Sequence, residues 1–398
     1  MPANRYAPAP LQELVWWKVH RPGKLKKPAH WKDNLHTRQA EKGKPQMPDD
    51  HFDVSIVDEA HALINPEHPR AITHSGWPNP FGPQAYHIIR ASRVSVFFMD
   101  SAQQFRERET TSGADIERWA GELGADTVTR VSLKGAQFRC AGSIEYVSWV
   151  EALLAGEDAR GCAKLAQQWT THRARLAAEP EPPPYVRSLA EAAPRRRGGF
   201  EFSVCESPED LEAMLRSRLA TGATARLMAS FARPWKTEDM TAPHELLPDE
   251  QDFVFRWNEK GRERVWARPW NVIPRNDYSH FIQAATGTRI AQDPLAEVGC
   301  TYAVRGFDFD YVGLLWLNDL RWSGREWYVD FEHVFETGLR GTLKSATRKK
   351  NPDTRAREDV LARVKQAYRI LMTRAIKGVF VYCEDPITRA HLQAALAS

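Results

Sequence analysis

Cysteine is scarce in this chain of 398 residues, and long apolar runs are missing. The five cysteines are scattered, at Cys140, Cys162, Cys205, Cys300 and Cys383. They form no CxxC pair and no Cys/His cluster with zinc spacing, so we expect free thiols in a reducing compartment. The N-terminus lacks the apolar stretch of a signal peptide, and nowhere do about 18 uncharged apolar residues follow one another. The sequence therefore predicts a soluble, cytoplasmic protein without a membrane partner.

Neither sign of charge dominates, and no internal repeat is visible. Lys and Arg number 55 against 51 Asp and Glu, which gives a formal net charge of +4. This balance permits a polyanionic partner without requiring one. The 42% of hydrophobic residues is enough for about two or three ordinary domains. The absence of a repeat of 20 to 50 residues argues against a solenoid or a propeller.

The first part of the chain changes character near residue 51. Residues 1–50 carry ten Lys/Arg against five Asp/Glu and show no hydrophobic period, so we expect a basic, loop-rich segment. From there, apolar runs at 52–58, 91–100 and 126–133 predict strands, and 115–125 predicts a helix between the last two. Strand, helix and strand at this spacing favour a parallel sheet.

The same alternation of strands and helices continues to the C-terminus. A Pro- and Arg-rich excursion at 177–200 interrupts it. Gly142 and Ser143 are a helix start signal, and Gly378 is predicted to cap the last long helix. The expected elements are 144–156 (helix), 200–207 (strand), 208–220 (helix), 225–231, 298–306 and 311–317 (strands), 360–375 (helix) and 379–385 (strand). We therefore expect an α/β protein with a first unit at 51–128 and a second at 129–398.

Two carboxylates follow the strand predicted at 52–58. Carboxylates at the C-terminal end of a parallel strand face the ligand crevice of an open α/β sheet. In that position Asp58 can hold Mg²⁺ through water, and Glu59 can orient an attacking water. An exposed acidic turn explains the same pair, and this alternative stays open.

Three further residues are candidates by position. Gln103 follows the next strand and can link a γ-phosphate to a nucleic-acid groove, or it is a surface loop residue. Arg139 precedes a helix and can stabilise charge across a cleft, or it is a surface arginine. Arg374 lies near the end of a helix, where the helix dipole alone also favours a cation.

In chain order, the stretches DEAH, FFMDSAQQ, QFRC, VGCTYAVRGFDFDYVG and YRILMTRAIKGVFVYC resemble the Schlafen group 3-like DNA/RNA helicase domain family, which is related to superfamily 1 helicases. The likeness runs from about residue 52 to 386. It implies two RecA-like parallel-sheet domains of a P-loop NTPase, of which the first is incomplete here. ATP and Mg²⁺ would lie in the cleft between them, with single-stranded DNA or RNA across their tops.

The resemblance also assigns roles to individual residues. It implies that Asp58 binds Mg²⁺, that Glu59 is the catalytic base and that Gln103 senses the γ-phosphate. Arg139 and Arg374 would be arginine fingers, which contribute roughly 10³ to 10⁵ in rate in related systems. The residues implied to lie at the nucleotide or the coupling loop are Gln137, Gly306 and Asp308.

The phosphate-binding loop of such domains, GxxxxGK followed by Ser or Thr, is absent from the sequence. Arg305 and Asp308 also stand where the family usually has Gln and Glu. We therefore expect weak ATP binding by this chain alone and an exposed apolar surface on a truncated first sheet. Three hypotheses remain: an ATPase whose phosphate loop lies on a separate polypeptide or was lost from the gene sequence, a non-catalytic remnant that binds nucleic acid or protein, and a plain α/β protein in which the motifs occur by chance.

Residues 340–357 hold seven basic residues and one acid. They predict salt-dependent phosphate contacts, or else a solvated basic loop. Some of the 14 tryptophans can stack bases, although most are expected in the core or at interfaces; they include Trp235, Trp257, Trp266 and Trp270.

Overall fold

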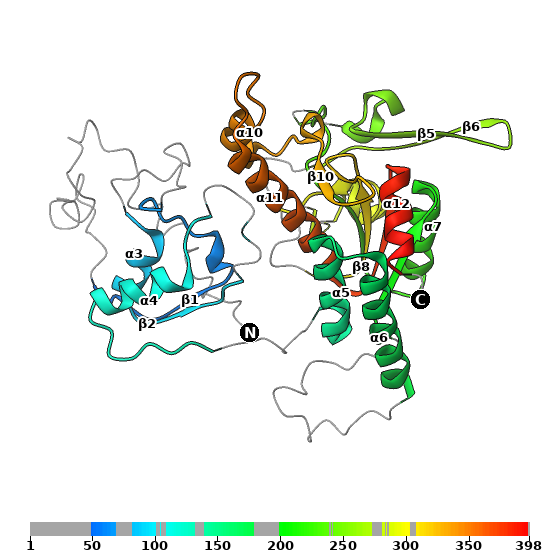
Figure 1. Cartoon of the computed structure of the whole chain (residues 1–398). Helices are drawn as coiled ribbons and strands as arrows, with labels where there is room; N and C mark the ends of the chain where they lie inside the picture. Colours follow the sequence, from blue (N-terminus) through cyan, green and yellow to red (C-terminus); the bar gives the residue numbers. More distant parts are fainter. Residues whose placement is uncertain are drawn as a thin grey trace. The chain divides into compact units, whose positions relative to one another are not determined.

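The computed structural model describes residues 49–68, 82–100, 104, 109–131, 139–178, 199–238, 240, 242–272, 281–282, 284, 286–302 and 308–396. The expected basic segment 1–50 and the excursion 177–200 lie almost wholly outside the described residues. The chain divides into two compact units, Met1–Val131 and Ser132–Ser398 (Figure 1). We describe each unit by itself.

The described residues of the first unit form a two-stranded parallel sheet, two α-helices and a short 3-10 turn. Its elements are β1 (Phe52–Val57), η2 (Ala60–Ala62), α3 (Gln84–Arg90), β2 (Ser92–Phe97) and α4 (Gly113–Glu122). The predicted strands at 52–58 and 91–100, their parallel pairing and the helix at 115–125 are confirmed. Helix α4 begins with a capping box in which Ser112 and Asp115 each accept the other's backbone N–H.

The strand predicted at 126–133 is wrong for its described part, because residues 126–131 are not in a strand. Val128 is 49% exposed and Val131 is 74% exposed. An alternating pattern makes a strand when one of its faces is buried and its backbone finds a partner. Neither condition holds for these residues.

One face of the β1–β2 sheet is covered and the other is open. Val57 is buried beside Ala60 and Ile88, and a second small cluster forms around Trp119. The open face carries five large apolar side chains that are 38% to 62% exposed: Val54, Ile56, Val94, Val96 and Phe98. Parallel sheets are normally buried on both faces, so this open apolar face is unusual. The sequence predicted such a surface for a truncated sheet.

The second unit is built on a five-stranded parallel sheet with the order β3-β11-β8-β4-β7. Its strands are β3 (Glu201–Cys205), β4 (Ala225–Ala229), β7 (Val298–Gly299), β8 (Phe309–Trp316) and β11 (Ala375–Cys383). Every residue of β4 is buried, as expected for an inner strand of a sheet covered on both faces. The predicted α/β class is therefore confirmed.

Helices cover both faces of this sheet (Figure 1). Leu211 and Leu215 of α7 lie over Gly313 of β8, where a Cβ atom would come within 2.5 Å of the Leu215 side chain. On the opposite face, Tyr368 of α11 stacks on Trp316 with the ring centroids 4.1 Å apart. The helices are α5 (Ile144–Ala155), α6 (Ala159–Ala178), α7 (Pro208–Leu219), α9 (Arg289–Gln292), α10 (Arg340–Ala346), α11 (Thr354–Thr373) and α12 (Pro386–Ala394).

Ser143 caps α5 by accepting the backbone N–H of Tyr146 at 3.1 Å, which confirms the predicted start signal. The prediction that Gly378 caps the last long helix is wrong, because Gly378 lies inside β11. A Cβ atom there would lie 2.9 Å from the carbonyl oxygen of Glu201 and 3.0 Å from Cε1 of Tyr311. This glycine is therefore required by the close approach of β3 and β8.

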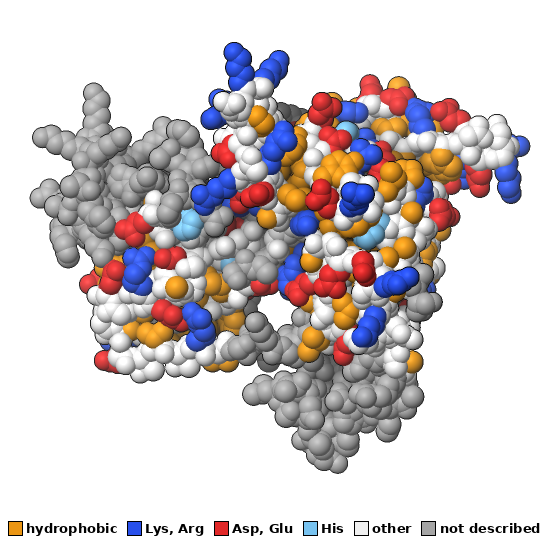
Figure 2. All heavy atoms as spheres, viewed as in Figure 1, with side chains coloured by type: hydrophobic (Ala, Val, Ile, Leu, Met, Phe, Trp, Pro, Cys, Tyr) orange, Lys and Arg blue, Asp and Glu red, His pale blue; other side chains and the backbone are white. Residues whose placement is uncertain are grey.

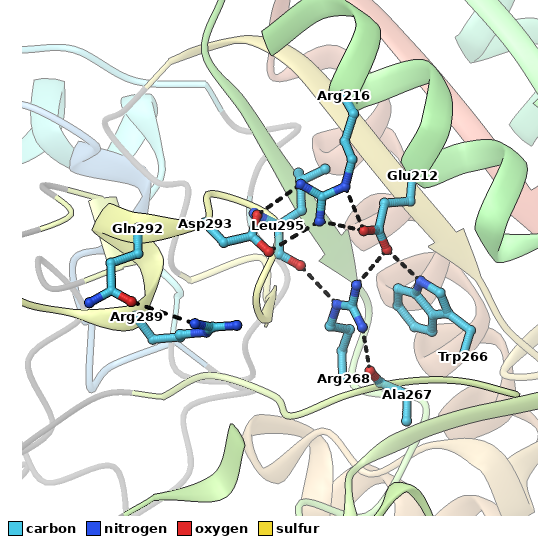
Figure 3. Close-up of polar contacts among 9 residues, drawn as sticks. All are labelled: Glu212, Arg216, Trp266, Ala267, Arg268, Arg289, Gln292, Asp293 and Leu295. Carbon is cyan, nitrogen blue, oxygen red and sulfur yellow. Dashed lines mark hydrogen bonds and ion pairs between the residues drawn. The ribbon is translucent and has the colours of Figure 1, made fainter. Parts of the chain in front are cut away.

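Two hairpins were not predicted: β5 (Phe253–Glu259) with β6 (Arg262–Arg268), and β9 (Leu320–Trp322) with β10 (Trp327–Val329). Figure 3 shows how the first is fastened to α7. Glu212 accepts from Arg268 at 2.6 Å and from the Trp266 indole at 2.7 Å. Arg216 contacts the same carboxylate and both oxygens of Asp293. Arg216 is thus bound by two carboxylates of the protein, and Arg268 by one carboxylate and by the backbone carbonyls of Ala267 and Leu295.

Short 3-10 turns complete the second unit: η5 (Cys140–Gly142), η7 (Pro243–Glu245), η8 (Pro248–Glu250), η10 (Phe331–His333) and η11 (Thr337–Leu339). All five cysteines are buried and none is in a disulfide, as predicted. Within the described part of the chain, no helix has the length and apolarity that crossing a bilayer requires.

Candidate functional site

The amino-terminal ends of β8 and β11 bring two predicted site residues to the same edge of the sheet. Phe309 of β8 pairs with Ala375 of β11. Asp308 directly precedes Phe309, and Arg374 directly precedes Ala375. Both side chains therefore start from neighbouring positions at the edge where these two strands begin.

Arg139 joins this edge from a distant part of the sequence. Its Nε atom lies 2.5 Å from Oδ1 of Asp308, and the side chains are 31% and 44% exposed. The turn after Arg139 is held against the end of α11, because Cys140 Sγ lies 3.6 Å from the carbonyl oxygen of Thr373. The Tyr146 hydroxyl donates to the carbonyl oxygen of Met372 at 3.0 Å. These contacts fix Arg139 beside the start of β11.

Arg374 differs from Arg139 in exposure. It is the C-cap of α11 and only 2% of it is exposed. Full burial is rare for arginine, so the alternative of a solvated cation at a helix end does not describe it. The Arg374 guanidinium is therefore enclosed at the edge where β8 and β11 begin, and it does not face solvent.

In the first unit, Asp58 and Glu59 directly follow β1, as predicted. Asp58 is exposed, and its Oδ1 accepts the backbone N–H of Glu59 at 2.9 Å. Glu59 has φ of 52°, a left-handed conformation that is uncommon for a residue with a side chain. The backbone N–H of Ala60 then bonds to the carbonyl of Phe98 at 2.8 Å, which ties the turn to the end of β2.

His61 is the residue of this site that the sequence interpretation missed. It is 1% exposed, and its Nδ1 accepts the backbone N–H of Asp100 at 3.3 Å. Its Nε2 lies 3.0 Å from Oε2 of Glu59. His61, in the turn that follows β1, thus lies against the Glu59 carboxylate and connects this turn to the residues after β2. The only sequence signal for it was its place as the fourth letter of DEAH.

Gln104 also belongs to this arrangement. Its side-chain amide donates to the carbonyl oxygen of Thr111 at 2.9 Å and to that of His61 at 3.4 Å. Three predicted site residues lie outside the described residues: Gln103, Gln137 and Gly306. Their roles stay predictions.

The donor atoms suit a magnesium ion better than they suit a triphosphate. The described residues contain no cluster of three His, Cys, Asp or Glu side chains for a metal. Mg²⁺ in nucleotide sites is usually held by one or two carboxylates together with phosphate oxygens and water, so one carboxylate, Asp58, fits that role. The phosphate-cradling GxxxxGK loop does not occur in these 398 residues.

The tryptophans considered for base stacking lie largely in the core. Trp270 is 0% exposed and Trp266 is 4% exposed. Trp235 and Trp257 are partly buried against the same cluster. The expectation that most of them are core residues is confirmed.

The sequence matches the profile of the family described as "Schlafen group 3, DNA/RNA helicase domain" over residues 17–385. The chain therefore belongs to this family of helicase domains. The match begins well before the DEAH stretch, so it extends further than the motifs alone indicated. An uncharacterized protein of Saccharomyces cerevisiae is 21% identical over 354 residues, which are 85% of this chain and 64% of that protein. The chain thus spans less than two thirds of this relative's length.

Proposed function

We propose that this chain carries the carboxylate and arginine parts of a nucleic-acid-dependent ATPase of the helicase type. The first unit would be an incomplete first RecA-like domain, and the second unit would be the second RecA-like domain. The observation that carries the proposal is the position of Arg139, Asp308 and Arg374 at one edge of the five-stranded sheet. These are the residues that the family resemblance assigns to the nucleotide.

The carboxylates after β1 have separate tasks in this proposal. Asp58 would be a Mg²⁺ ligand through its exposed oxygens, and bound Mg²⁺ would neutralise phosphate charge. Glu59 would accept the proton of the attacking water. His61 would act as a positioning residue, because it lies 3.0 Å from Oε2 of Glu59 and is itself held by Asp100.

The arginines would stabilise the negative charge that develops during phosphoryl transfer. Arg139 is partly exposed and already held by Asp308, so it can reach a ligand after a change of partner. Arg374 is enclosed, so its use requires this edge to open. Lysine cannot replace either residue fully, because it lacks the planar fork of donors.

Nucleotide affinity of the chain alone is expected to be low. Each charge-assisted hydrogen bond from a phosphate loop is worth about 1.5–3 kcal/mol, and about 1.4 kcal/mol corresponds to tenfold in affinity. The absence of several such bonds weakens ATP binding by orders of magnitude. A separate polypeptide carrying the phosphate loop would complete the site.

Phosphate release with and without single-stranded DNA or RNA tests the proposal. The assay is run on the chain alone and together with the polypeptides that co-purify with it from its own cells. Nucleic-acid-stimulated release should depend on Glu59, so Glu59→Gln should abolish it and Arg139→Ala should reduce it at least tenfold. Arg325→Ala, which changes an exposed arginine elsewhere in the second unit, is the matched control and should have no effect. Release that survives Glu59→Gln would refute the assigned base.

A non-catalytic binding protein is the second candidate, favoured by the missing GxxxxGK loop. It predicts binding to single strands with no phosphate release in any combination of polypeptides. Glu59→Gln would then leave oligonucleotide binding unchanged.

A further inference from the structure

We propose that the end of the α10–α11 helical hairpin binds the phosphate backbone of single-stranded nucleic acid without reading its sequence. This inference rests on the nucleic-acid part of the proposed function and gives that function a contact surface. The surface, called here the basic tip, consists of six cations on α10, on the turn after it and on the first turn of α11: Arg340, Lys344, Arg348, Lys349, Lys350 and Arg355.

The structure first corrects the expectation of a basic loop at 340–357. Residues 340–346 form α10 and residues from 354 onward form α11, so only a short turn is left between them. All six cations of the basic tip are exposed. Figure 2 shows Lys and Arg side chains gathered over this end of the hairpin.

None of the six cations has a carboxylate partner among the residues that the structure describes. Several arginines elsewhere in the same unit are engaged, as Arg216 is by Glu212 and Asp293 and Arg268 is by Glu212 (Figure 3). Unpaired cations on one short hairpin create a local positive potential, whereas the chain as a whole carries a net charge of only +4. The positive charge is therefore concentrated where the protein does not neutralise it.

The single acid of this segment is used inside the hairpin. Asp353 Oδ1 accepts the backbone N–H of Ala356 at 3.1 Å and so caps α11. The backbone N–H of Asp353 bonds to the carbonyl of Ser345 at 3.2 Å, which ties the turn to α10. The Asp353 carboxylate thus interacts with the N-terminus of α11 and not with the lysines of the basic tip.

The seventh basic residue has a structural task. Arg357 Nε donates to the carbonyl oxygen of Ala346 at 3.0 Å, and its guanidinium lies 5.3 Å from the centroid of the Phe331 ring. Ala346 is fully buried between the two helices. The contacts of Arg357 therefore hold the two helices of the hairpin together. The six outer cations are exposed on this hairpin and take no part in holding it.

The chemistry of the basic tip selects a phosphodiester chain. Residues 340–357 include no aromatic side chain, so the tip cannot stack bases. It also lacks an exposed large apolar side chain that could enter a lipid bilayer, since Leu343 packs against the core. Point charges on flexible stems contact phosphates independently of sequence, and they serve DNA and RNA alike.

Fluorescence anisotropy with labelled single-stranded oligo-dT and oligo-U tests this inference, using the full chain without nucleotide between 50 and 200 mM salt. The test variant replaces Lys344, Arg348, Lys349 and Lys350 by Ala. The control variant replaces four other exposed cations of the same unit that have no ion-pair partner among the described residues: Arg160, Lys164, Lys260 and Arg262. Both variants change the net charge equally, so only the position of the charge differs.

The test variant should lose roughly tenfold or more in affinity, and its slope of log K against log salt should fall by about 3, at about 0.7 per lost phosphate contact. The control variant should keep the wild-type slope. Equal losses in both variants, no binding by the wild type, or binding to anionic vesicles in place of oligonucleotides would overturn the inference. A thermal melt of both variants shows whether they are folded, and single Lys349→Glu is the fallback if the quadruple variant does not fold.

The failure of this inference is distinguishable from the failure of the proposed ATPase. Oligonucleotide binding that depends on the basic tip, with no phosphate release by the chain alone or together with any co-purifying polypeptide, supports the tip and refutes the catalytic proposal. Stimulated phosphate release that the tip variant leaves unchanged refutes the tip and supports the catalytic proposal.

Discussion

Arg139 and Asp308 form an ion pair with Nε and Oδ1 2.5 Å apart, although 169 residues separate them in the sequence. Each residue alone looked like an ordinary surface charge. The pair lies at the edge where β8 and β11 begin, and the strand pairing of Phe309 with Ala375 puts Arg374 at the same edge. The folded chain therefore turns three separate sequence signals into one local arrangement.

The first prediction is that this ion pair contributes little to stability. Both side chains are partly exposed, and pairs of this kind are typically worth about 0.2–1 kcal/mol. A double-mutant cycle with Arg139→Ala and Asp308→Ala, measured by urea unfolding, should give a coupling energy in that range. Coupling of several kcal/mol would show that the pair is a structural element, and it would weaken the proposal that Arg139 changes partner.

Gly378→Ala is predicted to destabilise the second unit by about 1–3 kcal/mol, because the added methyl group meets the Glu201 carbonyl and the Tyr311 ring. Urea unfolding measures the change. Gly121→Ala in α4 is the control, since nothing lies within 4 Å of its new Cβ. That substitution should be neutral or stabilising by up to about 1 kcal/mol. A neutral Gly378→Ala would mean that β3 and β8 are further apart than described.

Local patterns predicted much of the fold. Apolar runs located β1, β2, β3, β4 and β8, and Ser143 marked the start of α5. The β5–β6 hairpin was missed although the glycine in its turn, Gly261, is a local sequence signal. Lys260 and Gly261 both have positive φ, which is typical of a two-residue hairpin turn. Its flanking strands carry many charged residues, and these hid the alternation.

The site depends on distant pairings, which limited its prediction. The sequence named Arg139, Asp308 and Arg374 through the family resemblance, but their proximity follows from the register of β8 against β11. His61 could not be assigned a role, because its contact with Asp100 exists only once β1 and β2 are side by side. The enclosure of Arg374 was equally unpredictable, because burial of a cation at a helix end is a property of the packed core.

Glu297 is predicted to make stability depend on pH. It is 1% exposed, beside Arg226 and 3.6 Å from His244 Nε2. Burial raises its pKa from 4.5 to about 8, and Arg226 opposes the shift. The folded state thus keeps a proton that the unfolded state has lost, so the stabilising contribution is complete below pH 4.5 and is lost as the pH rises to about 8.

Glu297→Gln should remove this dependence. The stability of the variant relative to the wild type should rise between pH 5 and 8, by up to about 1.4 kcal/mol per pH unit. Urea unfolding at several pH values measures the difference. A constant difference for Glu297→Gln would contradict the raised pKa.

The open face of the first sheet gives the last prediction. Ile56 is 62% exposed, whereas its neighbour Val57 is 2% exposed, because successive residues of a strand point to opposite faces. Ile56→Thr should therefore change the free energy of unfolding by no more than about 0.5 kcal/mol, while Val57→Thr should lower it by about 1–3 kcal/mol.

Ile56→Thr combined with Val94→Thr should also reduce concentration-dependent self-association in analytical ultracentrifugation, because large open apolar patches promote association. If Ile56→Thr proves as destabilising as Val57→Thr, the face is covered in solution, and a covering segment must be sought by crosslinking from position 56.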